Sequence, residues 1–182
     1  MKETTLIIPA KNEPNALPMV LSEIKKMQLP VKVLVVIREE DEDTLRATKD
    51  YECDVLFQSK IGYGNAIVEG INHTKTKYSC IFYADGSTDP KYINQMKNKL
   101  VNEKLDLIFG SRYEKSAYSY DDDLITRIGN FGFTLLGNIF MRLKISDLLF
   151  TYVFAKTDCL KNMKLNSDDY CLCVEIPFKA KL

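Results

Sequence analysis

The stretch LIIPAKNE, residues 6–13, decides the fold class of this 182-residue chain. Its aliphatic run is closed by a proline, which is typical of a short strand buried on both faces. A second aliphatic run, rich in valine, spans residues 31–37. Between the two runs, one apolar stripe follows the 3.6-residue period of a helix, at Leu17, Val20, Leu21 and Ile24. The three segments therefore predict a β-α-β unit.

The same alternation continues outward from this unit. We expect helices at 43–51, from about 63 onward and at 90–101, and strands at 55–57, 78–83 and 105–109. Repeated strand-helix alternation predicts an α/β fold, with a mostly parallel central sheet and helices on both faces. In such sheets the ligand binds outside the carboxyl ends of the strands, so the loops after the strands are the places to search for a site.

Composition narrows the class of protein. Lys and Arg number 25 and so do Asp and Glu, and 46% of residues are hydrophobic. This balance excludes a disordered chain, and it argues against a nucleic-acid partner bound through a broad cationic face. Five cysteines without paired metal-ligand spacing, together with one histidine, indicate free thiols in a reducing compartment. Because the first residues lack the long apolar region of a signal peptide, we expect a cytoplasmic protein.

Two carboxylates follow the strand predicted at 78–83, in the run ADGSTDP at residues 84–90. Asp85 and Asp89 are oxygen ligands four positions apart, and such a pair can share Mg²⁺ or Mn²⁺ with a diphosphate. The alternative is local structure, because Asp-Gly-Ser is typical of turns and Asp89 is a good helix cap. The residues alone leave both interpretations open.

Three other loops carry candidate binding groups. The first loop offers backbone groups to a base and Glu13 to a ribose, although a capped helix start explains it as well. The turn that contains Lys60 and Gly64 allows close approach of the backbone to a ligand at a helix N-terminus. Arg112 offers a guanidinium to a phosphate, or is an ordinary surface arginine.

Together these motifs resemble family 2 glycosyltransferases of the GT-A fold, especially the dolichyl-phosphate mannosyltransferase and polyprenyl-phosphate glucosyltransferase branch. The resemblance covers nearly the whole chain, in the family's order, through IIPAKNE, GYGNAIVEGI, ADGSTDP, FGSRY, TRIGNFGF and ISDLLFTYVFAKTDCL. It implies one Rossmann-like glycosyltransferase domain, 1–182. Residues 1–113 would form its nucleotide-sugar-binding half. Residues 114–182 would form an acceptor-side half that is short at its C-terminal end, either by truncation or as a minimal form.

The resemblance also implies roles for single residues. The nucleotide sugar would be bound by Pro9, Ala10, Asn12, Glu13, Lys60, Gly64 and Asp85. The cation, Mg²⁺ or Mn²⁺, would be held by Asp85 and Asp89. The catalytic residues would be Arg112 on the donor phosphate, Asp147 near the reacting centre and Arg127 on an acceptor phosphate. Glu175 resembles the glutamate of a late helix of the family.

Two positions depart from the family pattern. Tyr83 stands where the first acid of the DxD element is usual, so cation binding would rest on Asp85 with Asp89 or water. Residues 38–41 read Arg-Glu-Glu-Asp in place of an Asp-Asp-Gly-Ser type of loop, which leaves the identity of the base open. A nucleotidyltransferase of related topology would require a glycine- and lysine-rich loop after the first strand, and Lys11 alone does not supply one.

The segment 124–143 has a wide apolar arc interrupted by arginines and asparagines. Such a helix can lie in the plane of a bilayer, or it can be a core helix or a pair hinged at its glycines. The implied activity is inverting transfer from a UDP- or GDP-linked sugar to a polyprenyl phosphate in cell-envelope glycan synthesis, at the cytoplasmic face of the membrane. A glycan hydroxyl as acceptor would need a base, with Asp147 the first candidate. The alternative is a catalytically impaired relative that binds nucleotide sugars or lipid.

Overall fold

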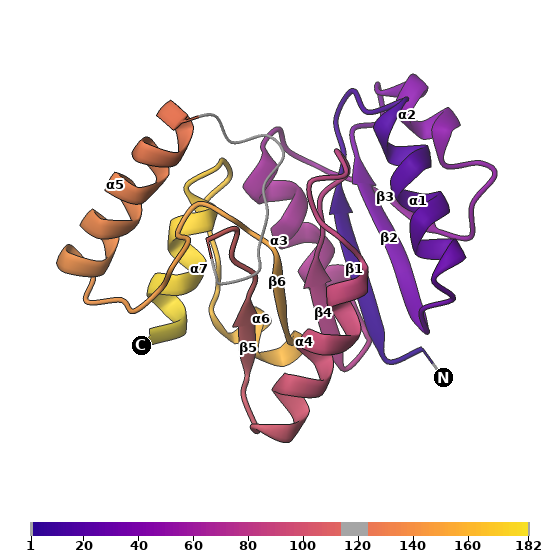
Figure 1. Ribbon diagram of the computed structural model, residues 1–182. Helices are drawn as coiled ribbons and strands as arrows, with labels where there is room; N and C mark the ends of the chain where they lie inside the picture. The colour runs from indigo at the N-terminus through magenta and orange to yellow at the C-terminus, as the bar shows by residue number, and fades with distance from the viewer. Residues whose placement is uncertain (1, 114–123, 182) are drawn as a thin grey trace.

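The computed structural model describes residues 2–113 and 124–181 (Figure 1). The strands are β1 (Thr4–Pro9), β2 (Val31–Ile37), β3 (Asp54–Phe57), β4 (Tyr78–Ile81), β5 (Leu107–Phe109) and β6 (Val153–Lys156). The helices are α1 (Ala16–Lys26), α2 (Glu42–Ala47), α3 (Tyr63–His73), α4 (Lys91–Asn102), α5 (Leu124–Phe140), α6 (Thr157–Asn162) and α7 (Leu172–Lys181).

The strands form one sheet in the order β3-β2-β1-β4-β6-β5. β1 runs parallel to β2 and β4, and β2 runs parallel to β3, whereas β6 is antiparallel to both β4 and β5. This confirms the predicted α/β class and the mostly parallel sheet. Since the order of the strands reverses beside β1, between β2 and β4, the topology places a ligand crevice at their carboxyl ends.

Each face of the sheet has its own core, because successive side chains of a strand point to opposite faces. Leu6 and Ile8 of β1 pack with the buried faces of α1 and α4, while Ile7 packs with α3, α6 and α7. The predicted stripe of α1 is confirmed, since Leu17, Val20, Leu21 and Ile24 are all buried. The continuous aliphatic runs of β1 and β2 are explained by burial from both sides.

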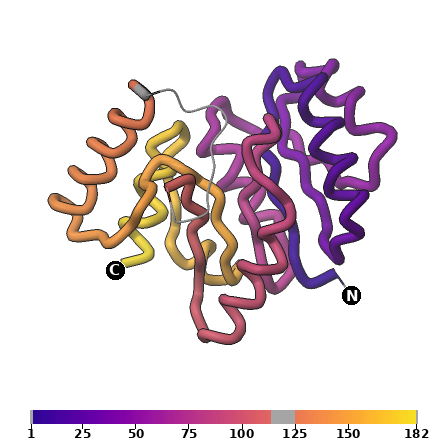
Figure 2. Tube along the Cα trace, viewed as in Figure 1, coloured from indigo at the N-terminus to yellow at the C-terminus, as the bar shows by residue number. Residues whose placement is uncertain are grey.

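The structure corrects several sequence-based boundaries. The strand predicted at 78–83 ends at Ile81, and α2 is shorter than the predicted helix 43–51. β6 was missing from the prediction. The apolar segment 124–143 forms one continuous helix over 124–140, so its glycines are not hinges. Figures 1 and 2 show α5 standing apart from the sheet, at the opposite end of the molecule from α1 and α2.

Candidate nucleotide-sugar site

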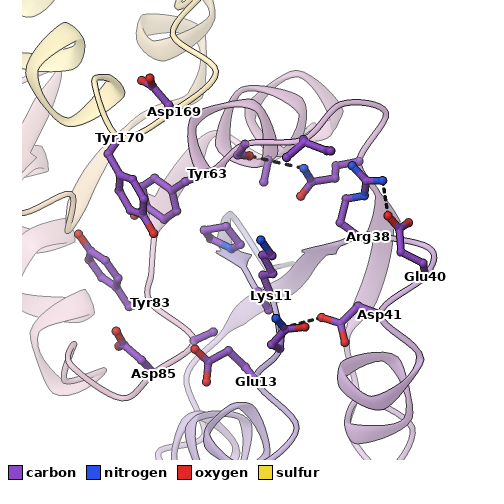
Figure 3. Close-up of a pocket in the computed structure, with 18 residues that line it drawn as sticks. Lys11, Glu13, Arg38, Glu40, Asp41, Tyr63, Tyr83, Asp85, Asp169 and Tyr170 are labelled. Carbon is purple, nitrogen blue, oxygen red and sulfur yellow. Dashed lines mark hydrogen bonds and ion pairs between the residues drawn. The ribbon is translucent and has the colours of Figure 1, made fainter.

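The carboxyl ends of β1, β2, β3 and β4 open onto a cavity of about 590 Å³, which we call the strand-end pocket (Figure 3). It is lined by Pro9, Ala10, Lys11, Asn12, Glu13, Arg38, Glu40, Asp41, Gln58, Ile61, Gly62, Tyr63, Ala66, Tyr83, Ala84, Asp85, Asp169 and Tyr170. Of the residues predicted to bind a nucleotide sugar, Pro9, Ala10, Asn12, Glu13 and Asp85 line this pocket. Lys60 and Gly64 do not.

The loop after β1 is braced against the start of α2. Asn12 adopts a left-handed conformation (φ 57°), and its backbone N–H donates to Asp41 at 2.7 Å. The N–H of Glu13 donates to the Thr44 hydroxyl at 2.9 Å. Asp41 also caps α2 by accepting from the Thr44 N–H at 3.2 Å. These bonds hold the main chain of residues 12–13 in place and leave the Glu13 carboxylate free to face the pocket.

The loop after β2 contributes a cation that the sequence analysis missed. Arg38 lines the pocket and pairs with Glu40 through one terminal nitrogen. Its Nε is buried and has no hydrogen-bond partner among the residues that the structure describes. A buried donor without an acceptor is costly, so this atom indicates a place where a ligand acceptor would bind. The sequence analysis considered this loop only because it departs from the Asp-Asp-Gly-Ser type of loop that is usual in the family.

Asp85 lies at the exit of β4, on the rim of the pocket. One of its oxygens accepts from the Ser87 N–H at 2.8 Å, which forms a local turn in which Gly86 adopts a φ of 84°. Burial raises the pKa of Glu13, and the negative charges of Asp85 and Asp41 raise it further. Figure 3 shows the carboxylates of Glu13 and Asp85 next to each other at one side of the pocket.

Asp89 makes local contacts at the start of α4, and its predicted metal role stays a prediction. It accepts from the Lys91 N–H at 2.9 Å and forms an ion pair with the Lys91 ammonium, at the start of α4. These contacts favour a role at the start of the helix, the alternative that the sequence left open. Within residues 2–113 and 124–181, no three His, Cys, Asp or Glu side chains gather as a metal site. Glu13 and Asp85 remain, and two carboxylates fit Mg²⁺ or Mn²⁺ when substrate phosphates complete the coordination.

Tyr170, Tyr63 and Tyr83 form one wall of the pocket, and Phe150, which is not part of the lining, stacks on Tyr83. We call these four rings the tyrosine ladder. Successive ring centroids lie 4.8, 6.3 and 5.6 Å apart in stacked geometry. The Tyr83 hydroxyl accepts from the Thr151 N–H at 2.9 Å. The tyrosine that replaces the first acid of the DxD element thus joins the wall of the pocket to the segment before β6.

The glycine-rich turn before α3 packs against a later loop of the same chain. A Cβ on Gly64 would lie 2.2 Å from the Ser167 carbonyl oxygen and 2.6 Å from that of Asp169. The N–H of Asn65 donates to the Asp168 carbonyl at 3.1 Å. The chain's own loop 166–170 therefore makes this close backbone approach, and nucleotide-sugar binding by Gly64 stays a prediction. Lys60 is exposed outside the pocket.

Glu175 positions that loop. Its carboxylate accepts from the N–H groups of Asn166 and Ser167 at 3.0 and 2.8 Å and pairs with Lys179 at 2.6 Å. Burial alone would raise the pKa of Glu175, but these partners outweigh it and lower the pKa to about 2. Through this turn, Asp169 and Tyr170 reach the pocket from a part of the chain about 80 residues beyond Asp85.

Asp147 and Arg112 form a buried pair outside the strand-end pocket. Asp147 is fully buried, and its two oxygens accept from Nε and a terminal nitrogen of Arg112 at 2.8 and 2.9 Å. The Arg112 N–H donates to the same carboxylate at 3.1 Å, and the guanidinium lies 5.0 Å from the ring centroid of Phe150. The structure therefore gives both residues a place in the fold, and their predicted contacts with the donor and the reacting centre stay predictions.

Helix α5 turns its polar stripe toward the protein. Asn130 donates to the Tyr113 hydroxyl at 2.8 Å, Thr134 accepts from the Leu148 N–H at 3.1 Å, and Asn138 exchanges two bonds with the backbone of Ile145. Its outer face is apolar and 46–80% exposed at Ile125, Ile128, Phe131, Phe133, Leu135, Leu136, Ile139 and Phe140. Arg127 is exposed on this helix and does not line the strand-end pocket. In the described part of the chain, no helix has the length and apolarity to span a membrane.

Comparison with known proteins finds similar glycosyltransferases. Uncharacterized glycosyltransferases of Mycobacterium bovis and Mycobacterium tuberculosis are each 29% identical over 108 residues, or 59% of this chain and 48% of those proteins. The chain thus spans about half the length of the curated relatives it matches.

Solved structures with the same fold include glucosyl-3-phosphoglycerate synthase from Mycobacterium tuberculosis in complex with Mn²⁺, UDP-glucose and phosphoglyceric acid. It has a TM-score of 0.74 at 15% identity, over 95% of this chain and 62% of that one. Mannosyl-3-phosphoglycerate synthase from Rubrobacter xylanophilus has a TM-score of 0.65 at 14% identity, over 86% of this chain and 54% of that one. The model of the Glycosyl transferase family 2 domain matches residues 5–163. The chain, with its strand-end pocket at the reversal of the sheet order, therefore belongs to glycosyl transferase family 2.

Proposed function

We propose that the protein transfers a sugar, with inversion, from a UDP- or GDP-linked donor in the strand-end pocket to a polyprenyl phosphate at the cytoplasmic face of a membrane. The observation that carries the donor half is the buried Arg38 Nε, which lacks an acceptor inside a pocket at the carboxyl ends of the strands. The synthase from Mycobacterium tuberculosis, which shares this fold, was crystallised with UDP-glucose and Mn²⁺.

Each side of the pocket has a task in this reaction. Pro9, Ala10 and Asn12 line the exit of β1, where the base and ribose would lie, and Arg38 would donate to an acceptor atom of the base or ribose. A divalent cation at Asp85 would neutralise the departing nucleoside diphosphate. The tyrosine ladder closes the opposite wall and limits access of water to the sugar.

Two features of the structure, the pairing of Asp147 and the exposed face of α5, favour a lipid phosphate as the acceptor. Asp147 is fully buried and both of its oxygens accept from Arg112, so we expect that it does not deprotonate an acceptor hydroxyl. A phosphate acceptor is already anionic and needs no such base. The outer face of α5, exposed and without acidic residues, is suited to lie at the boundary of headgroups and acyl chains, with Arg127 beside a lipid phosphate.

The direct test offers two acceptors to the protein with Mn²⁺ and either UDP-glucose or GDP-mannose. One is a polyprenyl phosphate in phosphatidylglycerol-containing vesicles, and the other is phosphoglycerate in solution. Nucleoside diphosphate release and the mass of the product are measured. Glycosylated polyprenyl phosphate supports the proposal. Transfer to phosphoglycerate alone contradicts the lipid acceptor, and donor binding without transfer to either indicates the binding protein that is the alternative.

Membrane contact has its own test with a matched control. The double substitution of Ile128 and Phe131 by Asp should abolish flotation of the protein with these vesicles. Met19→Asp, at an apolar residue of α1 that is 74% exposed, should leave flotation unchanged. Loss of flotation in both variants, or in neither, contradicts a membrane-facing role of α5.

A further inference from the structure

We propose that Tyr170 recognises the sugar of the donor, by packing its aromatic ring against one face of the sugar ring. This inference rests on the proposed function, because the donor must first bind in the strand-end pocket. Tyr170 lies in loop 166–170, just before α7, and outside every stretch of sequence that carries the family resemblance. Its role therefore has to be argued from its surroundings in this structure.

The ring of Tyr170 is stacked on one side and open on the other. It lies 4.8 Å from the ring of Tyr63, centroid to centroid, with 17° between the two planes. Tyr170 nevertheless remains 73% exposed while it lines the pocket. A single exposed apolar residue is common on any protein surface. An exposed ring that is stacked in place inside a cavity is different, because it offers a fixed aromatic surface to whatever enters that cavity.

The main chain that carries this ring is held at several points. The N–H of Asn65 donates to the Asp168 carbonyl at 3.1 Å. A Cβ on Gly62 would lie 1.9 Å from the same carbonyl oxygen, so the loop packs directly on the turn before α3. Glu175 binds the other end of the loop through two backbone N–H groups. A ring positioned in advance loses little conformational freedom when a ligand binds, and this favours affinity.

The other groups of the pocket indicate which part of the donor reaches Tyr170. Figure 3 shows Arg38 on one side of the pocket and both Tyr63 and Tyr170 on the opposite side. The same view shows Asp85 next to Tyr83, on the side of the tyrosines. In the proposed function the base lies toward Arg38 and the diphosphate toward Asp85. The sugar is attached to the phosphate farther from the base, so it is the part of the donor that faces the tyrosines.

A hexose suits an aromatic surface of this kind. One face of its ring carries mainly C–H groups, and packing them against an aromatic face removes apolar area from water. The contact uses the face of the ring and not the hydroxyl, so Tyr170→Phe should preserve it and Tyr170→Ala should remove it. Because only the sugar is contacted, the affinity for the nucleoside diphosphate alone should not depend on this residue.

The test is isothermal titration calorimetry of the full chain with Mn²⁺, comparing UDP with UDP-glucose and GDP with GDP-mannose. The variants are Tyr170→Ala, Tyr170→Phe and, as control, Tyr92→Ala, at a tyrosine of α4 that is 37% exposed and does not line the pocket. We expect Tyr170→Ala to lower the affinity for the nucleotide sugar about tenfold and that for the diphosphate less than about twofold. Tyr170→Phe and Tyr92→Ala should change either affinity by less than about twofold. Thermal unfolding of each variant confirms that it is folded.

The outcomes separate this inference from the proposed function. An equal loss for nucleotide sugar and diphosphate in Tyr170→Ala means that the ring contacts the base or the phosphates, which overturns the sugar contact and leaves donor binding intact. Unchanged affinity in Tyr170→Ala overturns it as well, and so does a loss of the same size in Tyr92→Ala. If the unaltered protein binds none of the four ligands, the proposed function itself fails, and the inference fails with it.

Discussion

The carboxylates at the centre of the sheet and the carboxylate beside its β5 edge differ in how they are paired. At the exits of β1 and β4, Glu13 and Asp85 present carboxylates that no basic side chain of the described chain neutralises. Beside β5, Asp147 is fully buried and bound by three donors of Arg112. The contrast teaches that a carboxylate in the family's motifs has one of two uses, and that its partners decide which. We predict that the open carboxylates of Glu13 and Asp85 serve a ligand, whereas the enclosed one of Asp147 serves the fold.

Apolar side chains also differ between two regions of the molecule, because they are buried in β1 and β2 but exposed on α5. Beneath the strand-end pocket, aliphatic residues of β1 and β2 are sealed between helices on both faces of the sheet. On α5 the polar stripe faces the protein and the apolar face is exposed. A helix turned outward in this way adds little to the core, so its apolar residues are available for a partner outside the chain.

The largest expected effect is the difference in unfolding free energy between variants of Asp147 and Asp85. Asp147→Asn removes the charge of a fully buried carboxylate whose two oxygens accept from Arg112, and breaking a buried pair costs about 3–5 kcal/mol of unfolding free energy. Asp85→Asn removes an exposed carboxylate and should change that free energy by less than about 0.5 kcal/mol. Urea denaturation measures both. Similar losses in the two variants would remove the distinction between the ends.

The second prediction concerns the stability of the fold at acidic pH, to which Glu175 contributes. Its pKa is about 2 in the folded protein and near 4.5 when the chain is unfolded, so its contribution is present above pH 4.5 and disappears as the pH falls toward 2. The shift corresponds to at most about 3 kcal/mol. Unfolding free energies between pH 6 and 3 should therefore decline less steeply in Glu175→Gln than in the unaltered protein. Parallel profiles would refute the role of Glu175 in holding loop 166–170.

Gly64 and Gly129 allow a comparison with a smaller expected effect. Ala at Gly64 would collide with the carbonyl oxygens of Ser167 and Asp169, and overpacking of this kind costs about 2 kcal/mol. Ala at Gly129 on α5 meets nothing within 4 Å and should stabilise the helix by up to about 1 kcal/mol. Thermal unfolding midpoints should move in opposite directions. A shift of the same sign in both variants would contradict the packing described for the turn before α3.

The smallest effect is expected on the outer face of α5. Phe140 is 79% exposed, so Phe140→Ser should change the unfolding free energy by less than about 0.5 kcal/mol. A fully buried aromatic, Phe154, gives the contrast, because Phe154→Ala should cost about 3–5 kcal/mol. Denaturant titration of both variants is the measurement. A large loss in Phe140→Ser would mean that α5 is covered by its own chain.

The sequence was sufficient for the parts of the site that follow directly from strands. Pro9, Asn12, Glu13 and Asp85 reach the pocket because each comes within a few residues of the end of a parallel strand, and such ends share one edge of the sheet. The stripe of α1 was equally direct, since its period determines which face is buried.

What the sequence did not reveal depends on contacts between distant residues. Tyr63 meets Tyr170, and Gly64 meets the loop held by Glu175, across roughly 100 residues of chain. The pairing of Arg112 with Asp147 joins the loop after β5 to the segment before β6, a four-residue antiparallel strand that the sequence analysis did not predict. Periodicity also revealed the apolar arc of α5 without indicating what that arc faces.

The central claim is that a nucleotide diphosphate binds at the reversal of the sheet order, with its base near β2 and its phosphates near β4. A crystal structure of the protein grown with Mn²⁺ and UDP or GDP tests it most directly. The account predicts density for the nucleotide along the exits of β1 and β2, a hydrogen bond to Arg38 Nε, and an ion next to Asp85. Nucleotide density elsewhere, with Arg38 and Asp85 unchanged, would contradict it.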